Sequence, residues 1–151
     1  NNIYVDIRQI SKIRPFIYKD FATILVNSKV LSKLDYCNSL LVNISKDKIH
    51  SLQKVQNNAA RLINKKDKFS SASPLLYDLH WLPVEKRVIY KICCLVFKSL
   101  HNNEPQYIDE LLSTYISNRS LLSSNDLTKL QKPLVSRAIG RQSFTFAGPH
   151  F

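Results

Sequence analysis

Apolar side chains recur every three or four residues across most of the first 115 positions, and this spacing constrains the fold more than any other feature. Such spacing places the side chains on one face of an α-helix. At about 83–101, apolar residues cover most of the helix circumference, and Arg87, Lys91 and Lys98 share the narrow strip that remains. A helix that is apolar on nearly all sides is usually central to its domain. We therefore expect this segment to lie in the middle of a helical domain.

Several other segments show helical spacing, and prolines separate some of them. Pro15 ends the first segment, whereas Pro83 and Pro105 suit the first position of the helices that they open. Only 2 of the 151 residues are glycine, which leaves few sites for the tight turns of a many-stranded sheet. We expect a mainly α fold, a compact bundle of five or six helices. The expected helices are 3–14, 17–33, 46–65, 83–101 and 105–115, with shorter helical turns at 34–42 and 74–79.

Two of these helices have well-defined faces. In the helix at 17–33, three lysines lie on one face, and the expected inner face consists of Ile17, Phe21, Ile24, Leu25 and Leu31. In the helix at 46–65, Ser45 suits the N-cap, and the basic residues gather within about 40° opposite an apolar stripe.

The pattern weakens after Tyr115. Phe144 and Phe146 alternate within a short segment, and this spacing allows a small β-hairpin around Gly140. We expect a helical domain at 1–125 and a short C-terminal extension at 126–151.

The composition indicates which class of partner the protein binds and in which cellular compartment it is found. Lys and Arg outnumber Asp and Glu by 22 to 11, so the net charge is +11, which favours a polyanionic partner, usually a nucleic acid. No apolar run approaches the ~20 residues of a membrane span, so we expect no membrane partner. The cysteines Cys37, Cys93 and Cys94 cannot all pair with one another. Reduced thiols in an intracellular protein, nuclear or cytoplasmic and not secreted, account for them most simply.

The sequence has no recognisable enzyme motif. It has no nucleophile elbow, P-loop or dinucleotide-binding glycine pattern, and its four histidines have no zinc-site spacing to the cysteines. His80 and Trp81 have two readings. Trp81 either fills the core where the chain turns into the next helix, which we favour, or stacks on a base.

The lysines and arginines on the polar helix faces are the candidate nucleic-acid contacts. Contacts of this kind go mostly to phosphates and carry little sequence information. The alternative is that each basic stripe is only a solvated helix face. The candidates are Lys19, Lys29, Lys33, Lys54, Arg61, Lys65, Arg87, Lys91 and Lys98.

Three strings carry a resemblance to a known family: LDYCNSLL (34–41), LQKVQNNAARLI (52–63) and LHWLPVEKR (79–87). With EPQYIDELL and NRSLLSS further on, they resemble the C-terminal region of non-LTR (LINE-type) retrotransposon reverse transcriptases, particularly the chicken-repeat and Jockey-like subgroup. The resemblance covers about 7–147. It implies a thumb or post-palm helical domain that grips template RNA and cDNA, or contacts target DNA. The first residues, NNIYVDIRQ, contain no starting Met, and we expect the chain to be a fragment of a longer protein.

The resemblance assigns no catalytic residue to this chain. Reverse transcription needs paired aspartates that hold two metal ions, and the sequence has neither an Asp-Asp pair nor a YxDD-like string. We expect no enzyme activity and no cofactor in this fragment, whereas the parent RNA-directed DNA polymerase would use Mg²⁺. The expected partners are the RNA or DNA backbone and the rest of the parent reverse transcriptase. The alternative function is a protein-interaction or scaffolding bundle that packs on the polymerase palm.

Overall fold

The computed structural model describes residues 3–102, 106–115, 129–137 and 139–150. Over these residues the chain is mainly α-helical, which confirms the predicted fold class. The described residues contain no strand, and an isolated antiparallel bridge joins Thr114 to Leu130. The chain divides into two units. The first comprises Asn1–Asn38 and Ile44–Arg87, and the second comprises Ser39–Asn43 and Val88–Phe151. The domain boundary predicted near residue 125 lies outside the described residues.

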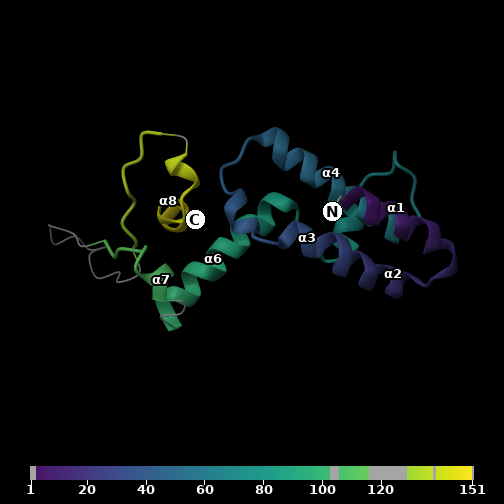
Figure 1. Ribbon diagram of the computed structural model, residues 1–151, viewed down its shortest axis with the longest axis horizontal. Coiled ribbons are helices and arrows are strands. Elements are labelled where there is room, and N and C mark those ends of the chain that lie inside the picture. The colour runs from purple at the N-terminus through teal and green to yellow at the C-terminus, as the bar shows by residue number, and fades with distance from the viewer. Residues whose placement is uncertain (1–2, 103–105, 116–128, 138, 151) are drawn as a thin grey trace. The chain divides into compact units, whose positions relative to one another are not determined.

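The first unit begins with an almost continuous run of helical segments, seen in purple and blue in Figure 1. The expected helix at 17–33 is built from three consecutive pieces, of which the middle one is π-helical. The segments are α1 (Ile3–Ile13), η1 (Arg14–Phe16), α2 (Lys19–Val26), η2 (Asn27–Leu31) and α3 (Ser32–Asp35).

The inner face predicted for 17–33 is correct in part, because Leu31 is buried and Leu25 packs on the core. Phe21 and Ile24 are exposed, whereas Ala22, Val26 and Val30 are fully buried at four-residue intervals. The small side chain of Ala22 suits a close approach of α2 to its neighbours α1 and the next long helix. The prediction therefore included two exposed residues, Phe21 and Ile24, and omitted this buried line.

Helix α4 (Lys46–Ile63) supplies much of the first unit's core through Val55, Ala59 and Ile63. Ser45 is the N-cap, as predicted, but its side chain makes no capping hydrogen bond. The helix ends two residues earlier than predicted. Lys65 has a positive φ of 51° and therefore lies outside the helix, so it does not continue the basic stripe.

Helix α5 (Ser73–Asp78) ends in the turn that leads to Trp81. The Trp81 amide donates to the Leu76 carbonyl at 2.8 Å and the His80 amide donates to the Tyr77 carbonyl at 3.0 Å. This is a Schellman end, and it needs a left-handed residue, here His80 with φ of 53°. Trp81 joins the core of the first unit, which confirms the reading that we favoured.

Helix α6 (Val84–Asn102) begins in the first unit and contributes its residues from Val88 onward to the second. Val88 and Ile92 form the second unit's core with Val42 and Ala147. The sequence predicts that this helix, apolar on nearly all sides, is central to its domain, but part of its apolar surface is exposed, at Cys93 and Phe97. The helix expected at 105–115 is the short α7 (Gln106–Asp109).

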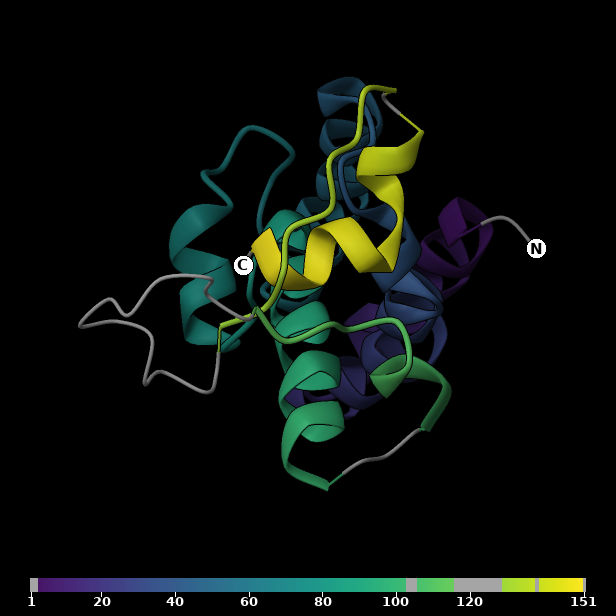
Figure 2. The same cartoon turned by 90° about the vertical axis from the view of Figure 1, so that its left-hand side faces the viewer.

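The predicted hairpin around Gly140 is also wrong. Short helical turns occupy this segment, seen in yellow in Figure 2: η4 (Gly140–Gln142), α8 (Phe144–Ala147) and η5 (Gly148–His150). Phe144 and Ala147, three residues apart, both pack on the second core, as a helix requires. The Ser143 hydroxyl accepts a hydrogen bond from the Phe146 amide at 3.4 Å and caps α8. A two-residue alternation was too short to distinguish this turn from a strand. The remaining helical turn is η3 (Asn38–Leu41).

Candidate nucleic-acid interface

Three of the nine basic candidates are engaged in contacts within the first unit. Lys33 forms an ion pair with Asp6. Arg87 forms a two-pronged ion pair with Asp35, in which its Nε donates to Oδ1 at 2.8 Å. These two basic side chains serve the fold, and their charges are locally neutralised by the carboxylates.

Arg61 is the third engaged candidate, and it fastens a loop. Its Nε donates to the Ser70 carbonyl at 2.8 Å, and its Nη1 donates to Asn58 Oδ1 at 3.3 Å. Arg61 is half-buried. The Ser70 carbonyl belongs to loop 64–72, which connects α4 with α5. Arg61 therefore positions that loop.

The other six candidates are exposed, and none of their ammonium groups forms a hydrogen bond or an ion pair with a described residue. Lys19 and Lys29 lie at the beginning of α2 and within η2, ten residues apart, and are not brought together. The remaining four are on two other surfaces. They are Lys54 and Lys65 of the first unit, and Lys91 and Lys98 of the second.

The first surface, called here the α4 basic face, consists of Lys54 on α4 and the lysines of loop 64–72. Lys54 lies two helical turns before Arg61, about 10 Å along the axis. The loop adds three exposed lysines against one acid, Asp67. Its lysines are Lys65, Lys66 and Lys68.

Prediction from the sequence missed Lys66, Lys68 and the exposed Phe69, because the segment was treated as a plain connection. The run KKDKF itself was the available signal, since it combines basic side chains with an aromatic ring.

The second surface, called here the α6 exposed face, lies on the second unit. Lys91 and Lys98 are two turns apart, and each follows an exposed aromatic residue, Tyr90 or Phe97. The ring of His101 stacks on Phe97 with 4.0 Å between centroids. A hydrogen bond with the Cys94 side chain, together with the electrostatic interaction between the two groups, raises the pKa of the Tyr90 hydroxyl. Basic and aromatic side chains in alternation suit nucleic-acid strands.

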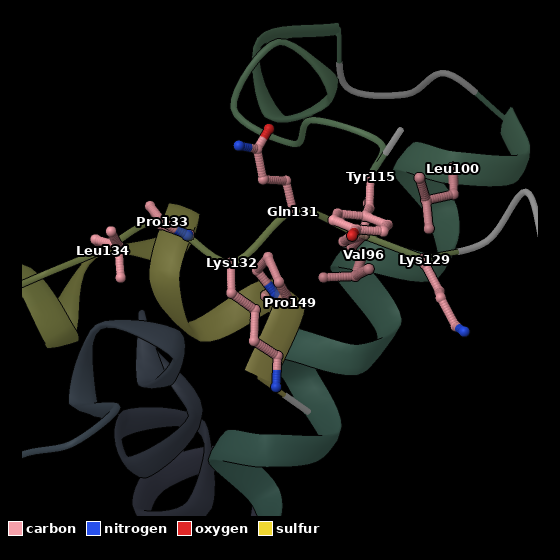
Figure 3. Close-up of a pocket in the computed structure, with 11 residues that line it drawn as sticks. Val96, Leu100, Tyr115, Lys129, Gln131, Lys132, Pro133, Leu134 and Pro149 are labelled. Atoms are coloured by element: carbon pink, nitrogen blue, oxygen red, sulfur yellow. The ribbon is translucent and has the colours of Figure 1, made fainter. Parts of the chain in front are cut away.

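The second unit also contains an open cavity of about 920 Å³ (Figure 3). Its wall is mostly apolar, with Val96, Leu100 and Pro149 among the residues that form it. Its two charged side chains, Lys129 and Lys132, extend toward different sides of the cavity in Figure 3.

Metal-binding groups do not gather in the described parts of the chain. Among these residues, no three His, Cys, Asp or Glu side chains lie close enough to hold a metal ion. The three cysteines are free thiols. None of the helices that the structure describes is long and apolar enough to cross a membrane.

Comparison of the chain with protein-family models, with curated proteins and with solved structures finds no match. Functional inference therefore rests on the residues and their geometry.

Proposed function

We propose that this chain is a non-catalytic, nucleic-acid-binding part of a non-LTR retrotransposon reverse transcriptase. The observation that carries the proposal is the α4 basic face, whose four exposed lysines make no ion pair with any described residue. Side chains of this kind bind phosphates without reading bases, as a domain that grips template RNA, cDNA or target DNA must do.

The contacts among the three family-like strings support the same proposal. Asp35 of the first string pairs with Arg87 of the third. Gln56 of the second string donates to the Leu82 carbonyl of the third at 2.8 Å. These contacts indicate that the three strings stabilise the fold. Binding is then assigned to the exposed basic side chains on other faces.

The parent polymerase would supply the catalytic aspartates and the Mg²⁺, and this part would have no catalytic residue. It would act inside the cell, where the template and the target DNA are found. Its partners would be the RNA or DNA backbone and the rest of the reverse transcriptase.

A charge-matched pair of variants tests the proposal. Lys54→Gln combined with Lys65→Gln removes two charges from the α4 basic face, and Lys12→Gln combined with Lys86→Gln removes two exposed charges elsewhere in the first unit. Affinity for a labelled RNA is measured by anisotropy at several salt concentrations. The first variant is expected to reduce the salt slope by about two, and the control by less than one. Equal effects of the two variants would show that net charge alone governs binding.

A scaffolding role is the second candidate, and a separate observation favours it. Four large apolar side chains around the start of α2 are exposed: Phe16, Tyr18, Phe21 and Ile24. A patch of this kind commonly packs against another protein surface. Absence of RNA and DNA binding by the chain at low salt would decide for scaffolding, since a packing role predicts little affinity at any salt.

A further inference from the structure

Phe69 is the most exposed of the described Phe, Tyr and Trp residues, at 87%. It lies in loop 64–72, whose composition is otherwise polar or small. The loop contains no other large apolar residue, so the ring of Phe69 is open to a ligand.

The loop presents Phe69 at the tip of a defined turn. The Ser70 amide donates to the Asp67 carbonyl at 3.0 Å, so Lys68 and Phe69 occupy the two central positions of a β-turn. Side chains at the central positions of such a turn project away from the hydrogen bond that closes it.

Both ends of the turn are attached to α4. Before the turn, the Lys66 amide donates to the Arg61 carbonyl at 3.0 Å. After the turn, the Ser70 carbonyl accepts from Arg61 Nε at 2.8 Å. Arg61 thus holds the segment before the turn through its main chain and the segment after the turn through its side chain. A loop fixed in this way loses little conformational entropy when a ligand binds.

The surroundings of the ring are cationic. Lys68 Nζ lies 4.9 Å from the centroid of the Phe69 ring. Lys65 and Lys66 precede the turn, and Asp67 is the only acid in the loop. An exposed aromatic ring with one ammonium group beside it and two further lysines in the same loop matches a nucleotide, whose base stacks on the ring while its phosphates approach the lysines.

We propose that loop 64–72 binds a single-stranded segment of nucleic acid, with one base stacked on Phe69 and the adjacent phosphates held by Lys66 and Lys68. This inference rests on the proposed function and specifies that loop 64–72 binds one unpaired base and its adjacent phosphates. A paired base in a duplex has both faces covered by its neighbours, so the loop selects unpaired bases.

Phe69→Ala in the full chain tests the proposal, with Tyr77→Ala as the matched control. Tyr77 is 81% exposed on the neighbouring helix α5. Binding of a labelled 12-nucleotide oligouridine and of a 12-base-pair RNA duplex is measured by anisotropy. Phe69→Ala is expected to weaken the single strand roughly tenfold, since a stacked base contributes on this scale. It is expected to leave duplex affinity and the salt slope unchanged, and Tyr77→Ala is expected to change neither affinity.

A complementary variant separates the charge from the ring. Lys68→Gln is expected to lower the salt slope by about one for both ligands. Phe69→Trp is expected to retain single-strand affinity and to show fluorescence quenching when oligouridine is added, because the only tryptophan in the wild-type chain, Trp81, is buried.

The possible failures are distinguishable. Normal binding with no effect of Phe69→Ala would overturn the loop assignment and leave the proposed function intact. Equal losses on single strand and duplex would overturn base stacking. No binding of either ligand by the wild-type chain at low salt would overturn the proposed function together with this inference, and would leave a protein surface as the occupant of the loop.

Discussion

Arg14 illustrates how much a single residue contributes to the first unit. Its side chain is buried at 6% exposure, and it donates to the carbonyls of Ile17, Leu62 and Ile63, the last at 2.6 Å. Two of these carbonyls are at the end of α4, where main-chain acceptors lack helical partners and the helix dipole is negative. The cation therefore satisfies a helix end in the core.

Arg14→Ala is expected to destabilise the first unit by about 3 kcal/mol, because it leaves the buried Ile63 carbonyl without the donor that Arg14 supplies. Urea unfolding followed by the fluorescence of Trp81, which lies in the same core, measures this change. Arg8→Ala, on the exposed side of α1, serves as the control and should cost less than about 0.5 kcal/mol. Similar losses in both variants would contradict this role of Arg14.

His80 has a left-handed backbone, and its own side chain is exposed. Glycine adopts this conformation without the strain of a β-carbon, although it also makes the unfolded chain more flexible. His80→Gly should therefore stabilise the first unit by about 0.5–1 kcal/mol, and His80→Val should destabilise it. The same urea titration gives both values. A loss of stability in the glycine variant would indicate that the His80 side chain contributes a contact.

At the scale of elements, α4 and the beginning of α6 are joined by two glutamines. The fully buried Gln56 donates to the Leu82 carbonyl at 2.8 Å, and Gln53 Oε1 accepts from the Val84 amide at 2.8 Å. Gln53 Nε2 also donates to Gln56 Oε1 at 2.9 Å. The first turn of α6 thus obtains a cap from a different helix.

Gln56→Ala is expected to cost about 2–3 kcal/mol, because it creates a small cavity and leaves the Leu82 carbonyl unsatisfied. His50→Ala, at an exposed position of the same helix, should be nearly neutral. Thermal unfolding of the two variants makes the comparison. Equal melting temperatures would mean that water replaces the Gln56 amide at no cost.

Helix positions were predictable from the sequence because the spacing of apolar residues is local. α1, α4 and α6 begin and end within about two residues of the predicted bounds. The inner face of α2 was predictable only in part, because which of its residues are buried depends on the helices that pack on it. The α4 basic face was predicted only in part, since Lys65 lies outside helix α4 and the candidate list did not include Lys66 and Lys68.

For the whole molecule, long-range pairs decide which basic residues are available for binding. Arg87 and Asp35 are 52 residues apart, and no spacing rule connects them. Lys33 and Asp6 are 27 residues apart. The nine-residue candidate list could not be reduced without the tertiary structure, because only packing shows which cations already have a carboxylate.

Arg87→Gln separates structural from binding roles. The ion pair with Asp35 is partly exposed, so its loss should cost about 1 kcal/mol of unfolding free energy. The salt slope of RNA binding should stay unchanged, because the Arg87 charge is already neutralised. A slope that falls by about one in this variant would instead make Arg87 a phosphate contact.

The salt dependence of nucleic-acid affinity for the wild-type chain tests the central claim most directly. If the four lysines of the α4 basic face each neutralise one phosphate, log K should fall against log salt with a slope of about −3 to −4. Affinity should then decrease about a hundredfold between about 50 and 200 mM salt. An affinity that does not change over this range, or no binding at its lower limit, would contradict the assignment of this chain as a phosphate-gripping domain.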